Sequence, residues 1–163
     1  MAAGSPSLAS LQEEPAVLPI RTVLYPTDFS DAARSAFDLA CALARDYRAT
    51  LIVAHVIAPG HVFAPNGAVV PFPTEEPGEA CDQLARMHPT SPGLHAYYRL
   101  LKGDPAEQIL KLATDVKADM VVMATHGTSG LTRLLVGSVA ESVMRKAECP
   151  VLTMRIPTQP VPT

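Results

Sequence analysis

Short apolar runs rich in β-branched residues alternate with stretches of helical periodicity along most of this 163-residue chain. Such alternation is typical of a mostly parallel sheet covered by helices. Five strands are expected, at Thr22–Tyr25, Thr50–Ile57, Tyr97–Leu101, Met120–Thr125 and Val151–Ile156. With right-handed crossovers and a chain that runs outward from the middle twice, the strand order is 3-2-1-4-5. The sequence therefore predicts a single α/β domain with an open sheet and helices on both faces.

Individual residues mark where the predicted strands and helices begin and end. Pro26 is expected to stop the first strand. Ser30 and Asp104 can each cap a helix through a side-chain oxygen. Ser138 is followed three residues later by Glu141, which predicts a capping box at the start of the last helix. These signals place a helix after the first, third and fourth strands.

The predicted folded domain spans residues 20–156, between a flexible tail at 1–19 and another at 157–163. Within the domain, the segment Ala58–Pro92 contains seven prolines and leaves room only for a short helix near Glu79–Met87. A long crossover loop is expected there. Such loops are usually either functional or mobile, and the sequence leaves both readings open.

Composition excludes several classes of protein. The net charge of -3 and the pI near 5.9 lack the basic surface that nucleic-acid binding needs. No apolar run reaches the length of a bilayer span, and the first twenty residues lack the pattern of a secretory signal. Three widely spaced cysteines fit reduced, packed thiols better than disulfides or a zinc site. We therefore expect a cytoplasmic protein without a membrane or nucleic-acid partner.

The ends of the predicted strands are where a ligand is expected. In open α/β sheets, ligands bind outside the carboxyl ends of the strands, where the strand order reverses. The first strand is followed by Thr27 and Asp28, the second ends in His55 and Val56, and the fourth is followed by the segment 124–127. Because the first and fourth strands are predicted neighbours, their loops should face one crevice.

The loop after the fourth strand carries Gly127, Gly130 and Gly137 and leads directly into a helix. Glycines let backbone N–H groups turn toward a ligand, and a helix start presents further unpaired N–H groups that favour an anion. Ser138 adds a hydroxyl donor at the same place. The alternative is that the glycines serve only tight turns and that Ser138 only caps its helix.

These residues resemble the universal stress proteins over almost the entire predicted domain. In the nucleotide-binding branch of that family, the loop reads glycine, two residues, glycine, nine residues, glycine and serine or threonine. Gly127, Gly137 and Ser138 match that pattern, whereas Ala124 stands in place of its first glycine. The opening segment 25–30, the His55-Val56 pair and the segments 137–141 and 149–151 match as well. The resemblance implies a Rossmann-like fold of the adenine nucleotide α-hydrolase-like type.

The resemblance also implies which residues form the site. Asp28 would accept hydrogen bonds from the ribose or adenine side, the backbone of Val56 would pair with the adenine edge, and Arg133 would neutralise phosphate charge. The full implied set is Pro26, Thr27, Asp28, Val56, Ala124, Thr125, His126, Gly127, Thr128, Ser129, Gly130, Arg133, Gly137, Ser138, Val139 and Ala140. For Asp28 the alternative is a helix cap or loop contact, and for His126 it is a loop donor. No catalytic residue and no protein metal ligand is predicted.

The implied ligand is ATP or a related adenine nucleotide, with or without Mg²⁺. No Walker motif and no glycine-rich fingerprint of dinucleotide enzymes is present, so at most slow hydrolysis is expected. The expected role is a nucleotide-dependent module in stress response that forms a homodimer through the edge strand Val151–Ile156. The rival interpretation, favoured by Ala124, is a protein-interaction module that has lost the nucleotide. A nucleotide hydrolase or nucleotidyl transferase is a third possibility.

Overall fold

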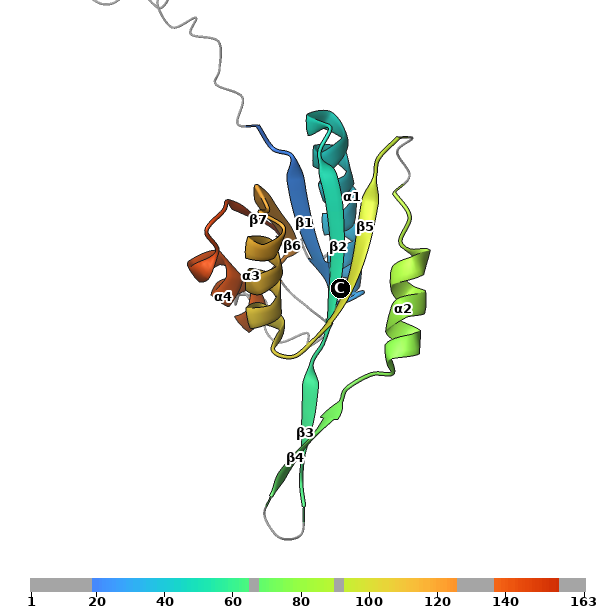
Figure 1. Ribbon diagram of the computed structural model, residues 1–163, viewed down its shortest axis with the longest axis vertical. Helices are drawn as coiled ribbons and strands as arrows, with labels where there is room; N and C mark the ends of the chain where they lie inside the picture. The colour runs from blue at the N-terminus through green and yellow to red at the C-terminus, as the bar shows by residue number, and fades with distance from the viewer. Residues whose placement is uncertain (1–18, 65–67, 90–92, 126–136, 156–163) are drawn as a thin grey trace, which may run out of the picture.

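A computed structural model describes residues 19–64, 68–89, 93–125 and 137–155. Its central sheet contains β1 (Thr22–Thr27), β2 (Thr50–Ile57), β5 (Ala96–Lys102), β6 (Met120–Ala124) and β7 (Val151–Met154). The strands lie in the order β5-β2-β1-β6-β7, and all neighbouring pairs are parallel (Figure 1). The predicted open sheet and its strand order are therefore confirmed. The predicted tails lie outside the described residues except for Pro19, and so does Ile156.

Two pairs of helices cover the two faces of the sheet. The helices are α1 (Asp31–Tyr47), α2 (Pro77–Arg86), α3 (Pro105–Asp115) and α4 (Ser138–Lys146). Buried residues of α1 and α2 pack with one face of the strands, and those of α3 and α4 pack with the other. The buried side of α1 is mostly alanine, so this helix lies close to the sheet. None of the described helices is both long enough and apolar enough to cross a bilayer.

Helix starts follow the predicted capping residues at two of three places. Ser30 Oγ accepts from Ala33 N–H at 3.2 Å, and Asp104 Oδ1 accepts from Glu107 N–H at 2.9 Å. The capping box predicted at Ser138 is wrong. Gly137 is the cap, because its carbonyl accepts the first intrahelical bond, and none of the described side chains caps this helix. Ser138 is therefore already the first residue of α4.

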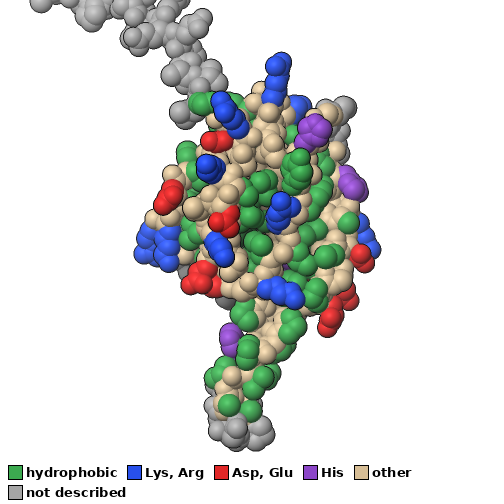
Figure 2. Space-filling view, viewed as in Figure 1, with side chains coloured by type: hydrophobic (Ala, Val, Ile, Leu, Met, Phe, Trp, Pro, Cys, Tyr) green, Lys and Arg blue, Asp and Glu red, His purple; other side chains and the backbone are tan. Residues whose placement is uncertain are grey.

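The crossover between β2 and α2 contains a β-ribbon that the sequence did not predict. β3 (Pro59–Phe63) and β4 (Val69–Pro73) pair antiparallel and project from the end of β2, away from the body of the domain (Figure 1). The expected long loop is therefore wrong, whereas the expected short helix is α2. Between 58 and 74 the sequence has no Asp, Glu, Lys or Arg. Figure 2 shows hydrophobic side chains along the described part of the ribbon, with no red or blue side chains among them.

The prolines of the ribbon stand at positions where they remove none of the hydrogen bonds between β3 and β4. Thr74 N–H donates to Ala58 O at 3.3 Å, so this is a hydrogen-bonded pair. Because such pairs alternate in antiparallel strands, Pro59, Pro71 and Pro73 all fall at positions whose N–H would point outward. The ribbon therefore keeps its internal hydrogen bonds, while the outer edge of β4 has lost two donors.

Candidate functional site

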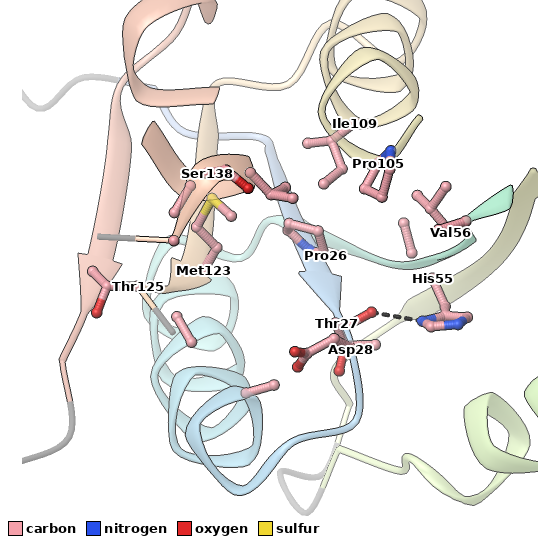
Figure 3. A pocket seen from close by; sticks show the side chains of 17 residues that line it. Pro26, Thr27, Asp28, His55, Val56, Pro105, Ile109, Met123, Thr125 and Ser138 are labelled. Carbon is pink, nitrogen blue, oxygen red and sulfur yellow. Dashed lines mark hydrogen bonds between the residues drawn. The ribbon is translucent and has the colours of Figure 1, made fainter. Parts of the chain in front are cut away.

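A cavity of about 320 Å³ lies at the carboxyl ends of β1, β2 and β6 (Figure 3). Its size falls within the range of small-molecule sites. Ten of the sequence-predicted site residues line it, namely Pro26, Thr27, Asp28, Val56, Ala124, Thr125, Gly137, Ser138, Val139 and Ala140. The predicted residues His126, Gly127, Thr128, Ser129, Gly130 and Arg133 lie outside the described residues. The predicted residues that are described thus gather around one cavity.

The cavity opens where β1 and β6 separate. Asp119 N–H donates to Thr22 O at 2.9 Å, so the even-numbered residues of β1 direct their backbone groups toward β6. The two strands pair only as far as Leu24 opposite Val121, although both continue. Pro26 is the next even-numbered residue and has no N–H to donate. It therefore ends the ladder with β6 and leaves the crevice open.

Pro26 does not stop β1, contrary to the prediction. β1 pairs with β2 as far as Thr27 opposite His55. The odd-numbered residues of β1 face β2, so a proline at an even position leaves that ladder intact. The residue that was expected to end the strand instead separates β1 from one of its two neighbours.

The backbone of Val56 faces the end of β1, and Val56 lines the same cavity. Gly103 N–H donates to Ile57 O at 3.1 Å, so odd-numbered residues at the end of β2 face β5, and Val56 faces the β1 side. The pairing of β1 with β2 ends at Thr27. The next N–H along β1 that could serve Val56 belongs to Phe29, and it donates to Thr27 Oγ1 at 3.0 Å instead. The Val56 carbonyl therefore points past the end of the β1 ladder.

The turn after β1 is held by side chains as well as by backbone. Asp28 Oδ1 accepts from Ser30 N–H at 3.1 Å and from Ser30 Oγ at 2.6 Å. Phe29 has a φ of 62°, in the left-handed region that non-glycine residues seldom adopt. The loop contact named as the alternative for Asp28 is thus present. It leaves the carboxylate among the residues that line the cavity (Figure 3).

Gly137 brings the start of α4 close to the end of β6. Its N–H donates to Thr125 O at 2.7 Å, so this amide is directed at the protein and not at the cavity. Its φ of −58° is ordinary, so no left-handed conformation requires glycine there. A Cβ at this position would lie 3.1 Å from Thr125 O, which is tighter than most real contacts. Glycine is therefore favoured at 137 by close approach.

The first residues of α4 present backbone donors at the cavity. The first intrahelical bond runs from Glu141 N–H to Gly137 O at 2.9 Å. The N–H groups of Ser138, Val139 and Ala140 therefore have no acceptor within the helix. All three residues line the cavity, and the positive end of the helix dipole lies there. This end of the cavity suits an anion.

His55 joins the turn after β1 to the crossover. Its Nδ1 lies 2.7 Å from Thr27 O (dashed in Figure 3), and its Nε2 contacts Glu75 Oε1. Its ring centroid lies 4.3 Å from that of Phe29. The sequence predicted His55 at the end of the second strand, but no local pattern indicated a role for Glu75. This contact depends on the path of the crossover, which the sequence did not predict.

Apolar residues complete the cavity on the side of α3. Pro105, Ile109 and Met123 were not among the predicted site residues, yet they line it with Ala33, Ala54, His55 and Ala58. Met123 directly precedes Ala124 on β6, and Pro105 opens the helix that follows β5, so the strand-end rule could have found both. Among the described residues, no group of three or more His, Cys, Asp or Glu side chains is placed to hold a metal ion.

A second cavity, of about 510 Å³, borders the same turn from the side of α1 and α2. Thr27 and Phe29 line it together with Arg34, Asp38 and Arg86. These three charged side chains belong to exposed residues of the two helices. The turn after β1 therefore separates two cavities, and its orientation affects the shape of both.

Together, the sheet and the cavity define an open α/β domain with a ligand-sized site at the point where the strand order reverses. A sequence profile of the universal stress protein family matches residues 19–155. A universal stress protein of Methanocaldococcus jannaschii is 33% identical over 142 residues, which are 84% of this chain and 83% of that protein. One of Thermus aquaticus is 34% identical over 139 residues, 83% of this chain and 98% of that protein. The chain belongs to the universal stress protein family.

Solved structures agree with this fold. A universal stress protein from Lactobacillus plantarum has a TM-score of 0.71 at 24% identity, with 85% of this chain and 99% of that chain covered. A universal stress protein solved in complex with cAMP has a TM-score of 0.58 at 31% identity, with 85% of this chain and 98% of that chain covered. The parallel sheet and its helices are thus shared with this family.

Proposed function

We propose that this chain is an adenine nucleotide-binding universal stress protein, with ATP as the ligand, that acts as a regulatory or binding module in stress response. The observation that carries the proposal is the composition of the 320 Å³ cavity. One of its ends offers a strand-end carbonyl and the other offers helix-start amides. An adenine nucleotide has an amino group on its base at one end and phosphates at the other, so its two ends match the two ends of the cavity.

The adenine end of the proposed ligand would lie beside Val56. The backbone carbonyl of Val56 points past the end of β1 and can accept from the adenine amino group. Ile109 and Pro105 from α3 provide apolar surface for the ring on the same side of the cavity (Figure 3). Asp28 lies at the carboxyl end of β1, within the cavity lining, where it would accept from the ribose.

The phosphates would lie at the start of α4. The amides of Ser138, Val139 and Ala140 have no acceptor within their helix and lie at the positive end of its dipole. The Ser138 hydroxyl, which does not cap the helix, would be a further donor. The proposed site also includes the loop residues His126, Gly127, Thr128, Ser129, Gly130 and Arg133, as the sequence motif implies. Mg²⁺ would reach the site with the triphosphate.

The comparison with known structures supports the class of ligand. The universal stress protein that is 31% identical to this chain was solved with cAMP, which shares adenine, ribose and a phosphate with ATP. Fast phosphoryl transfer would require a lysine at the phosphates, ligands for Mg²⁺ and a residue that orients the nucleophile. Asp28 is the evident candidate for any of these three roles. Its Oδ1 already accepts two hydrogen bonds from Ser30. We therefore expect binding with at most slow hydrolysis.

Two measurements test the proposal. Mass spectrometry of protein purified without added nucleotide and then denatured should detect a released adenine nucleotide. Calorimetric titration with ATP and Mg²⁺ should give saturable binding. If millimolar ATP with Mg²⁺ produces neither heat nor a thermal shift, nucleotide binding is refuted.

A pair of glycine variants shows whether binding occurs in this cavity. Gly137→Ala places a methyl group 3.1 Å from Thr125 O and should displace the start of α4, so ATP binding should weaken. Gly78→Ala is the matched control, because a Cβ at Gly78 meets nothing within 4 Å and the residue lies in α2. Equal ATP affinities in the two variants would place the nucleotide elsewhere.

A second candidate function is a protein-interaction module without a nucleotide. The observation that favours it is the ribbon, on which the large apolar residues Val62, Val69, Val70 and Phe72 are exposed. Such a surface is typical of contact with another protein. The ATP titration separates the two candidates, because an interaction module without a ligand gives no heat with ATP.

A further inference from the structure

The turn that carries Asp28 is held in place from outside the cavity by a chain of contacts that starts in the crossover. The chain runs from Glu75 through the His55 ring to Thr27, the residue before Asp28. The His55 side chain is 8% exposed and that of Glu75 is 25% exposed. Contacts that are shielded from water to this degree restrict the groups that they join more than surface contacts do.

The Thr27 carbonyl determines which nitrogen of the His55 ring must carry a hydrogen. A backbone carbonyl can only accept, so His55 Nδ1 must carry the hydrogen that is donated to Thr27 O over 2.7 Å. This leaves Nε2 facing the Glu75 carboxyl group. The partner at one ring nitrogen sets the orientation of the ring and thereby the direction of the other hydrogen bond.

The ring in turn supports a turn of unusual conformation. Phe29 stacks against His55 and has a φ of 62°. A left-handed phenylalanine persists only where surrounding contacts hold it. Its neighbour Asp28 is oriented by the same turn through two hydrogen bonds from Ser30. The direction of the Asp28 carboxylate therefore depends on the contacts of His55.

Glu75 is held in reach of His55 by the closure of the ribbon. Thr74, the preceding residue, donates to Ala58 O both from its N–H at 3.3 Å and from its Oγ1 at 2.8 Å. Ala58 directly follows β2 and lines the cavity. These two bonds anchor the returning chain beside β2, where the Glu75 side chain contacts the His55 ring.

We infer that Glu75 is a positioning residue of the ligand cavity, which acts through His55 on the turn at Thr27–Ser30. Its effect on a nucleotide rests on the proposed function, whereas its effect on the turn does not. The crossover then contributes to the site through a residue that does not line the cavity. The matched control is Glu76, an exposed neighbouring carboxylate that makes no side-chain cap bond in α2.

The first test uses the ligand-free protein. In ¹⁵N NMR spectra, Glu75→Ala should shift the ring nitrogens of His55 and the amides of Thr27, Asp28, Phe29 and Ser30, while Glu76→Ala should leave them unchanged. Glu75→Gln keeps a polar group against Nε2 and should restore the wild-type amide positions. The inference is overturned if Glu75→Ala leaves these signals unchanged, or if Glu75→Gln shifts the amides of residues 27–30 as far as Glu75→Ala does.

The second test uses ATP with Mg²⁺ as the probe. Glu75→Ala should weaken binding about fivefold, the loss expected from one hydrogen bond, whereas Glu76→Ala should not. Glu75→Gln should bind close to wild type, which a general loss of stability would not explain. Equal affinities for Glu75→Ala and Glu76→Ala would overturn the effect on the ligand. If the wild type does not bind ATP, the proposed function fails, and the NMR test still decides the role of Glu75.

Discussion

Ala124 is the residue at which this chain departs from the nucleotide-binding motif. Its backbone conformation and its contacts determine how the extra methyl group affects the cavity. It is the last residue of β6 and pairs with Met154, and it is not among the described residues with positive φ. A β conformation accepts alanine without strain. The methyl group therefore adds bulk at the cavity wall and does not distort the backbone.

We predict that Ala124→Gly changes ATP affinity by less than about threefold, because the wild-type backbone needs no glycine there. The variant should lose roughly 0.5–1 kcal/mol of unfolding free energy, as expected for a glycine in a strand. Ala124→Val should weaken ATP binding, since a branched side chain narrows the cavity. Calorimetry and urea denaturation measure both quantities. A large gain in affinity for Ala124→Gly would show instead that the methyl group excludes the nucleotide.

Cys41 gives a prediction about alkaline pH. Burial, with a smaller effect of the Asp38 charge, raises the pKa of the Cys41 thiol from 9.0 to about 11. The unfolded chain therefore loses this proton first as pH rises. The stability that comes from keeping the thiol protonated is fully present below about pH 9 and is lost as pH rises through about 11.

Urea denaturation between pH 8 and 11 tests this prediction. The unfolding free energy should fall less steeply in Cys41→Ala than in the wild type, because the variant lacks the titrating thiol. Tyr25, whose pKa is raised mainly by burial and to a smaller degree by the Cys41 charge, is present in both proteins, so the effect of its burial contributes to both curves. Parallel curves of unfolding free energy against pH for the two proteins would contradict the prediction.

At pH 8, exposed Cys81 should react with iodoacetamide much faster than buried Cys41.

Residues of the site differ in how far the sequence alone could predict them. Asp28, Val56 and Ser138 follow from strand ends and a glycine motif, which are local patterns, and all three line the cavity. Glu75 could not be predicted, because its contact with His55 joins positions 20 residues apart through an unrecognised ribbon. Pro26 was predicted to end the first strand. Whether it interrupts the pairing of β1 with β2 or with β6 depends on which backbone groups face each neighbour, and this is not visible in the local sequence.

At the scale of elements, the β3–β4 ribbon is the part of the fold that sequence patterns failed to predict. Its prolines argued against strands, because proline usually breaks a ladder. Pro59, Pro71 and Pro73 break no hydrogen bond of the ribbon, because they stand at positions whose N–H would point outward. The central strands and the helices were predictable because their apolar periodicity reflects burial in the two core clusters, one on each face of the sheet. The ribbon packs mainly on itself, so its sequence carries no such pattern.

We predict that the ribbon can be removed without loss of the cavity. Replacing Pro59–Pro73 with Asn-Gly keeps Ala58 and Thr74 as the hydrogen-bonded pair that flanks a two-residue turn. The unfolding free energy should change by less than about 1 kcal/mol, because a two-stranded ribbon alone adds little stability. ATP affinity should stay within about twofold, since Glu75 is still anchored beside His55.

Urea denaturation and ATP titration of the shortened protein provide the measurement. The control combines the same replacement with Glu75→Ala, which should weaken ATP binding as it does in the full chain. A shortened protein that folds normally but binds ATP much more weakly would show that the ribbon itself contributes to the site.

At the scale of the whole molecule, the order of the sheet leaves β7 as an edge strand. Thr125 N–H donates to Met154 O and Val121 N–H donates to Pro150 O, so even-numbered residues of β7 face β6. The odd-numbered Val151 and Thr153 therefore direct their backbone groups to the open edge. Leu152 is 38% exposed beside them. An edge of this kind can pair with the same edge of a second copy across a two-fold axis.

We predict a homodimer through β7 that Thr153→Pro disrupts. Proline removes an N–H that faces the open edge and leaves the bonds to β6 in place, so the monomer should fold normally while its association weakens. Thr153→Ala is the control, because it shortens the side chain and keeps the N–H. In sedimentation velocity at micromolar concentration, the wild type and Thr153→Ala should be dimers and Thr153→Pro a monomer. A dimeric Thr153→Pro with unchanged affinity would place the interface elsewhere, and a monomeric wild type would mean that β7 remains an unpaired edge.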